Sequence, residues 1–210
     1  MNRIASTDWI PGARRRPSPN CDDRPPGCEP SLLIIHCISL PPGQFGGDDV
    51  DRLFTNRLDP ADHPFYAEIQ GLRVSAHLFI RRDGTLVQYV PLHRRAWHAG
   101  RSRFQGRRAC NDLSIGIELE GTEDSDYTIA QYRVLAATAV AIQSAYPRIT
   151  PERCTGHSNI APGRKTDPGP GFNWFRFRQG LQNARDCWRR AEFASMLFPS
   201  DSGNGQGGRS

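Results

Sequence analysis

A nine-residue segment, SLLIIHCIS at residues 31–39, constrains the fold more than any other part of the chain. Prolines lie close to both of its ends, and a short, continuous apolar run of this kind is typical of a strand buried inside a sheet. Its longest purely aliphatic stretch is Leu32–Ile35, whereas a membrane span needs about 20 mostly apolar residues. The sequence therefore predicts a buried central strand and no membrane-spanning segment.

Further strands are expected on either side of a tight turn. Residues 77–82 and 85–90 flank Asp83-Gly84, a dipeptide that is the strongest short signal for a β-hairpin. Residues 113–119, LSIGIEL, have the composition of another buried strand.

The hydrophobic pattern changes to a helical period from Thr128 onward. Thr128 and Gln131 have the spacing of a capping box, and apolar residues recur at helical intervals until Pro147. A second amphipathic helix is expected over residues 173–190 and a short one over residues 64–72. Strands followed by helices favour an α/β (α+β) fold, a central mixed sheet flanked by helices, over a doubly wound parallel sheet.

The length of 210 residues suggests one domain with extensions, because a domain typically takes about 100–200 residues. Residues 1–30 hold six prolines and an arginine triplet at 14–16, so we expect a poorly ordered arm there. Residues 200–210 are rich in serine and glycine, and we expect a flexible tail over residues 191–210. The predicted folded domain spans residues 31–190.

Cysteine usage and the N-terminal sequence bear on the compartment. The six cysteines show no C-x-x-C spacing, and the first thirty residues contain no apolar core followed by a cleavage site. Both features predict reduced thiols and a cytoplasmic protein. The net charge of +5 and the arginine triplet could suit nucleic acid, but a solvated charge run is the favoured explanation, and no nucleic-acid motif accompanies them. We expect a monomer with no nucleic-acid or membrane partner.

Three segments hold polar residues that packing does not explain. His36 interrupts the apolar strand, Glu118 lies in IGIELE on the face shared with Gly116, and a Gly/Pro-rich loop carries His157, Lys165 and Asp167. Two histidines and one carboxylate form a typical catalytic zinc set, Glu118 fits a general base, and Lys165 fits a partner for an oxyanion. On residue types alone, a metal hydrolase and a satisfied core histidine at position 36 remain equally open.

Lysine usage singles out one member of this group. Lys165 is the only lysine, and the other 26 basic residues are arginines. Since arginine and lysine are interchangeable on most solvated surfaces, a specific need for a compact ammonium at position 165 is the functional interpretation. An accident of composition is the alternative.

Five longer sequence segments resemble the AmpD group of N-acetylmuramoyl-L-alanine amidases, a zinc amidase family that also includes peptidoglycan-recognition proteins. They are IIHCISLPPGQFGG (34–47), LRVSAHLFIRRDG (72–84), VQYVPLHRRAWHAG (87–100), CNDLSIGIELEG (110–121) and TGHSNIAPGRKTDPGPGFNW (155–174). The resemblance covers residues 30–179 and implies a mixed sheet flanked by helices, with one Zn²⁺ in a groove.

The resemblance also implies roles for individual residues. His36, His157 and Asp167 match the zinc ligands, Glu118 the residue that activates water, and Lys165 the group that polarises the substrate carbonyl. Two further residues, Arg73 and Trp97, resemble groove residues that contact substrate, and ordinary structural roles explain them equally well. We expect His77 and His98, which lie in the shared segments, to support or pack against the site.

The implied substrate is a small muropeptide, cut at the amide between 1,6-anhydro-N-acetylmuramic acid and L-alanine of the stem peptide. This reaction belongs to cell-wall recycling and influences β-lactamase induction in some bacteria. One departure from the family is Cys37, which replaces an asparagine; a thiol is a weaker donor, so sugar selectivity could be relaxed. The alternatives are an amidase for intact peptidoglycan and a non-catalytic peptidoglycan-binding module of the same fold.

Overall fold

The computed structural model describes residues 8–189 and contains a six-stranded mixed sheet. The strand order is β1 (Arg14–Arg15), β5 (Leu86–Gln88), β4 (Leu78–Ile80), β9 (Ser114–Glu120), β3 (Leu32–Ile38) and β10 (Cys154–Gly156). Only the β4–β5 pair is antiparallel, and the other four pairings are parallel. The mixed sheet, the hairpin and the two longest strands are thus as the sequence predicted.

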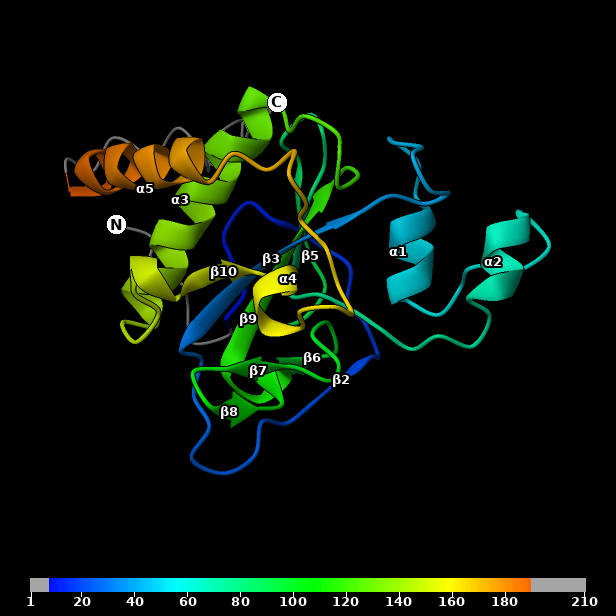
Figure 1. The fold of residues 1–210 in the computed structure, drawn as a ribbon, viewed down its shortest axis with the longest axis horizontal. Coiled ribbons are helices and arrows are strands. Elements are labelled where there is room, and N and C mark those ends of the chain that lie inside the picture. Colours follow the sequence, from blue (N-terminus) through cyan, green and yellow to red (C-terminus); the bar gives the residue numbers. More distant parts are fainter. Residues whose placement is uncertain (1–7, 190–210) are drawn as a thin grey trace, which may run out of the picture.

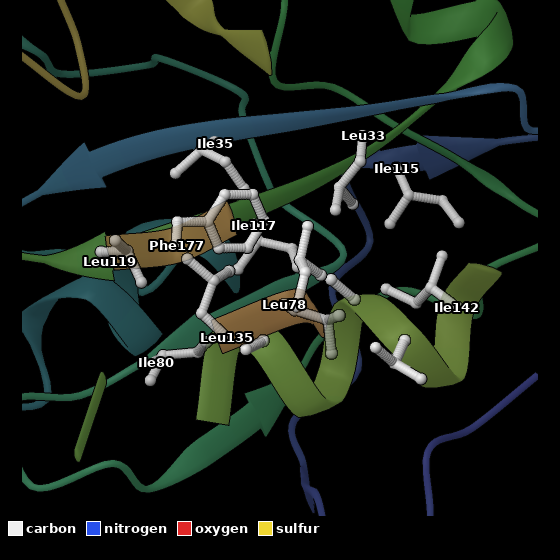
Figure 2. Packing of buried hydrophobic residues seen from close by; sticks show 14 of the residues in the cluster. Leu33, Ile35, Leu78, Ile80, Ile115, Ile117, Leu119, Leu135, Ile142 and Phe177 are labelled. Carbon is white, nitrogen blue, oxygen red and sulfur yellow. The ribbon is translucent and has the colours of Figure 1, made fainter. Parts of the chain in front are cut away.

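Two long helices cover one face of this sheet. Helix α3 (Ile129–Ala145) begins with the predicted capping box, and α5 (Trp174–Arg189) lies against it (Figure 1). Figure 2 shows the core between them and the sheet, where Ile115, Ile117 and Leu119 of β9 meet Leu135 and Phe177. Burial of this apolar layer is the main favourable contribution to folding. The helix expected over residues 173–190 is present as α5, and residue 190 lies outside the described residues.

The opposite face carries shorter elements. Helices α1 (Asp49–Phe54) and α2 (Pro64–Glu68) pack with Phe79 and Tyr89 in a second apolar cluster, away from α3 and α5 (Figure 1). The remaining short elements are the pairs β2 (Cys21–Asp22) with β6 (Arg95–Ala96) and β7 (Arg103–Phe104) with β8 (Arg107–Arg108), the 3₁₀ helices η1 (Cys110–Leu113) and η2 (Pro151–Arg153), and α4 (His157–Ile160).

The N-terminal segment differs from the expectation of an arm. Within residues 8–30, β1 extends the main sheet, β2 pairs with β6, and Ile10 is buried in the core. The Arg24 guanidinium donates to main-chain carbonyls of five residues, among them Leu92, Asn111 and Ser114. These hydrogen bonds hold the segment against the domain. The expected disorder of residues 1–7 and the tail at 191–210 lie outside the described residues.

No helix within residues 8–189 is both long enough and apolar enough to cross a membrane.

The two faces of strand β9 differ in chemistry. Gly116, Glu118 and Glu120 lie on one face, and the core isoleucines and Leu119 lie on the other. Because β3 and β9 are parallel and in register, His36 lies directly beside Glu118.

Candidate metal centre and active-site pocket

Three potential metal ligands converge at the carboxyl ends of two neighbouring strands. His36 lies on β3, and His157 begins α4 directly after β10, which pairs with β3 so that Gly156 faces Ile35. Nδ1 of His36 lies 3.0 Å from Nδ1 of His157, and Asp167 Oδ2 lies 2.9 Å and 3.1 Å from these two nitrogens. All three residues are buried, and they form the one such group detected in the described part of the chain.

Close backbone packing fixes the loop that carries Asp167. Ser158 N donates to Asp167 O at 2.9 Å, which ties the loop to the start of α4. A Cβ on Gly156 would lie 2.8 Å from Pro168, and one on Gly169, whose φ is +79°, would lie 2.3 Å from the Glu123 carbonyl oxygen. The glycines at these two positions therefore allow the close approach that places the Asp167 carboxylate beside both imidazoles.

Electrostatics favour the protonation states that metal ligands need. Burial lowers the pKa of His36 to about 4, so its imidazole is neutral near neutral pH. Burial alone would raise the pKa of Asp167, but contact with His157 and His36 outweighs it and holds the pKa below its ordinary range. A neutral imidazole beside a carboxylate is the form that binds a divalent metal.

Glu118 is a buried carboxylate without a structural partner. Its side chain lies beside the three ligands, and its buried Oε2 accepts no hydrogen bond from any residue between 8 and 189. Burial, and then the negative charge of Asp167, raise the pKa of Glu118 well above its ordinary value, while Lys165 lowers it. Leaving a buried polar atom unpaired is costly, so this carboxylate has the character of a functional group.

These groups share one pocket of about 370 Å³. Exposed Lys165 lines it together with Glu118 and the three ligands, and its other walls include Cys37 and Trp97. An apolar wall completes it, made by residues such as Leu40, Phe65, Ile69 and Leu72. The arrangement combines a metal-binding set, a potential base and an ammonium group with a surface for apolar parts of a ligand.

The two expected substrate contacts differ in position. Trp97 lines the pocket, and its indole Nε1 donates to Asp22 Oδ1 at 3.2 Å. Arg73 is exposed and lines a neighbouring cleft instead, and Leu72 lines both this cleft and the pocket.

Cys37, which also lines the pocket, is a neutral thiol. Burial raises the pKa of the Cys37 thiol to about 12, so this pocket residue remains protonated.

The sequence predicted that His98 supports the site, but it gave no role to Ala99 or Asn111. His98 contacts His36, and the carbonyl of Ala99 contacts His157. Asn111 accepts hydrogen bonds from the backbone of both His98 and Ala99. The available signal was the shared segments WHAG and CND, which mark these positions without showing what they touch.

Comparison with known proteins is consistent with this fold and this site. The family model described as N-acetylmuramoyl-L-alanine amidase matches residues 26–170. The chain therefore belongs to the N-acetylmuramoyl-L-alanine amidase family.

Within the family, the chain is similar to 1,6-anhydro-N-acetylmuramyl-L-alanine amidase AmpD of Escherichia coli. The two are 61% identical over 170 residues, which cover 81% of this chain and 92% of the relative. The crystal structure of a selenomethionine AmpD derivative superimposes with a TM-score of 0.83 at 57% identity, over 86% of this chain and 99% of that one.

A more distant solved structure contains a ligand. It is the E. coli amidase AmiD in complex with the substrate anhydro-N-acetylmuramic acid-L-Ala-D-γ-Glu-L-Lys. The TM-score is 0.52 at 30% identity, and the match covers 75% of this chain and 60% of AmiD.

Proposed function

We propose that this protein is a zinc-dependent amidase that hydrolyses the amide between 1,6-anhydro-N-acetylmuramic acid and L-alanine of a stem peptide. The observation that carries the proposal is the convergence of His36, His157 and Asp167 beside Glu118 and Lys165 in one pocket. The 61% sequence identity to E. coli AmpD, over 92% of that protein's length, supports the choice of substrate. The corresponding process is recycling of cell-wall fragments in the cytoplasm, with an influence on β-lactamase induction.

The donor set fits one Zn²⁺ per chain. Two imidazole nitrogens and one carboxylate oxygen are borderline-soft and hard ligands that zinc accepts, and three protein ligands leave a position open to water. When bound, zinc supplies Lewis acidity and lowers the pKa of water toward about 7. The unpaired Oε2 of Glu118 beside this set supports the same assignment, because an active-site water would give it a partner.

Glu118 acts as the proton carrier. A carboxylate with a raised pKa takes a proton from water more readily than an ordinary glutamate does. The same group then returns the proton to the departing amine of L-alanine. Strand β9 places Glu118 beside the ligand His36, so a water held at the metal position would lie within its reach.

Lys165 stabilises the oxyanion that develops on the amide oxygen. Its ammonium group is a compact positive charge at the rim of the pocket, two residues before Asp167. The Asp167 loop therefore positions both a metal ligand and the electrophilic group.

The rest of the pocket binds the two halves of the substrate. Trp97 and the apolar wall offer a surface for the sugar face, while Arg73 at the neighbouring cleft suits a stem-peptide carboxylate through paired donors. Cys37 in the pocket replaces the asparagine of the family segment, so discrimination between anhydro and reduced sugars is weaker than an amide donor would give. The enzyme acts as a monomer.

The test offers the zinc-loaded protein anhydromuropeptides, reduced muropeptides and intact sacculi, and identifies products by mass. The proposal expects cleavage of anhydromuropeptides to free peptide, with sacculi cut far more slowly. Preference for sacculi would favour an extracellular amidase and overturn the cytoplasmic role. Binding of all three substrates without cleavage would favour a peptidoglycan-binding module.

A further inference from the structure

His36 and His157 can both bind a metal here only if each imidazole carries its lone pair on Nδ1. A neutral imidazole carries a hydrogen on one nitrogen and a lone pair on the other. The nitrogens that converge on Asp167 are Nδ1 of His36 and Nδ1 of His157. Metal binding there requires both hydrogens to lie on Nε2, and the partner of each Nε2 decides whether they do.

For His157 the partner is a backbone oxygen. Nε2 lies 3.1 Å from the carbonyl oxygen of Ala99, which can only accept a hydrogen bond. Arg164 Nη2 lies 3.4 Å from the same Nε2 but only 2.7 Å from the carbonyl, so the guanidinium donates to the carbonyl. The His157 hydrogen is therefore on Nε2.

For His36 the partner is a second imidazole, and a chain of hydrogen bonds sets its direction. His36 Nε2 lies 2.9 Å from His98 Nδ1, and His98 Nε2 lies 3.3 Å from Ser114 Oγ. The Ser114 hydroxyl donates to the Cys110 carbonyl at 2.6 Å, which leaves its oxygen free to accept from His98. Because the carbonyl at the end can only accept, every hydrogen points away from the metal site, and His98 Nδ1 receives the hydrogen of His36.

The ring and the backbone of His98 are both held in place. A Cβ on Gly116 would lie 2.5 Å from His98 Nδ1, so the ring packs directly over the strand backbone where only glycine leaves room. The backbone is fixed as well, because Asn111 Oδ1 accepts from the N–H groups of His98 and Ala99 at 3.2 Å and 2.8 Å. The dipeptide His98-Ala99 thus supplies both acceptors, Nδ1 of His98 for His36 and the carbonyl oxygen of Ala99 for His157.

We propose that His98 is a positioning residue of the metal centre, which accepts the Nε2 hydrogen of His36 and thereby presents Nδ1 to the metal. Asn111 and Gly116 align His98, and Asn111 aligns Ala99 for His157 at the same time. This inference rests on the proposed metal centre, and it concerns metal affinity before any substrate binds.

The test measures the zinc affinity of the full chain by competition with a chelator. Loss of an outer hydrogen-bond partner typically weakens metal binding about 10- to 100-fold, and His98→Ala should fall in this range. His98→Asn can place Oδ1 where Nδ1 stood, so it should restore most of the affinity. His77→Ala is the matched control: the ring of this buried histidine contacts that of His98 edge-on, with centroids 5.6 Å apart, and within residues 8–189 its hydrogen bonds go to groups other than the three ligands.

A measurement on the unchanged protein covers the case in which a variant does not fold. In the zinc-loaded chain, NMR should detect a scalar coupling across the hydrogen bond from His36 Nε2 to His98 Nδ1. Absence of this coupling with zinc bound would overturn the proposal. Wild-type zinc affinity in His98→Ala, or equal losses in His98→Ala, His98→Asn and His77→Ala, would also overturn it.

The outcomes separate this inference from the proposed function. A wild-type chain that binds no zinc would remove the metal centre and both proposals with it. An active, zinc-loaded wild type beside an unaffected His98→Ala variant would overturn the positioning role alone.

Discussion

Replacing Glu118 with glutamine should abolish most turnover, leave the metal bound, and stabilise the zinc-free protein. The side chains are nearly isosteric, but glutamine cannot take a proton from water. A positioned general base contributes about 10²- to 10⁴-fold, so kcat should fall by about that factor. Zinc content should stay near one per chain, because Glu118 is not among the three converging ligands.

The gain in stability follows from the environment of the carboxylate. Oε2 of Glu118 is buried and has no hydrogen-bond partner within residues 8–189. When this carboxylate is ionised, its unpaired charge costs at least about 1–3 kcal/mol, and the neutral glutamine amide does not carry that charge. Because the pKa of Glu118 in the folded chain is raised, wild-type stability falls as the pH rises above the ordinary glutamate value of 4.5. The difference between Glu118→Gln and wild type should therefore be small at pH 4 and grow toward about 1–3 kcal/mol at pH 8.

The neighbouring Glu120 provides a matched control on the same face of β9. Its carboxylate is also buried, but it accepts hydrogen bonds from Gly46 N at 2.6 Å and Arg82 N at 2.8 Å. Glu120→Gln should therefore destabilise the chain by about 1–3 kcal/mol. The assay is chemical unfolding of the zinc-free variants, with turnover measured after zinc loading. The reasoning would be refuted if both substitutions changed the free energy of unfolding in the same direction. It would also be refuted if Glu118→Gln kept a near-wild-type kcat.

Other substitutions test the remaining groups. Lys165→Arg keeps the charge but replaces a compact ammonium with a planar guanidinium, so kcat should fall at least about tenfold, with zinc content unchanged; near-normal kcat would make the lone lysine an accident of composition. Asp167→Ala should weaken zinc binding itself, measured by chelator competition, and unchanged affinity would remove Asp167 from the ligand set. Burial, and then the charge of Arg24, lower the pKa of His77 from 6.5 to about 3, so stability present above pH 6.5 is lost as the pH falls toward 3, by about 5 kcal/mol at most. His77→Asn should flatten this part of the stability profile of the zinc-free chain, and an unchanged slope would contradict the assignment.

Local patterns account for the parts of the fold that the sequence predicted. Helix α3 begins at its predicted capping box, and the hairpin forms around Asp83-Gly84 because both signals depend on residues a few positions apart. The alternation in β9 likewise predicted Glu118 on the face away from the core isoleucines, because side chains along a strand alternate with a period of two. The ligand set came from residue types together with the resemblance to the family.

Long-range contacts account for what the sequence did not predict. The N-terminal segment lacks local order signals, and it is fixed by pairing with β5 and by Arg24, whose acceptors lie up to 90 residues away. His98 and His36 are 62 residues apart, so their contact depends on the packed sheet. A composition rich in proline and arginine describes a segment in isolation, and cannot show which carbonyls will receive its guanidinium groups.

Hydrolysis of an anhydromuropeptide in water enriched with oxygen-18 tests the central claim most directly. Attack by water on the amide carbonyl places one labelled oxygen in the carboxylate of the anhydromuramic acid product and leaves an unlabelled free amine on L-alanine. Mass spectrometry of the zinc-loaded wild type should show this pattern, with little product from Glu118→Gln. Label at any other bond, or equal product from the variant, would contradict an amidase in which Glu118 transfers the proton.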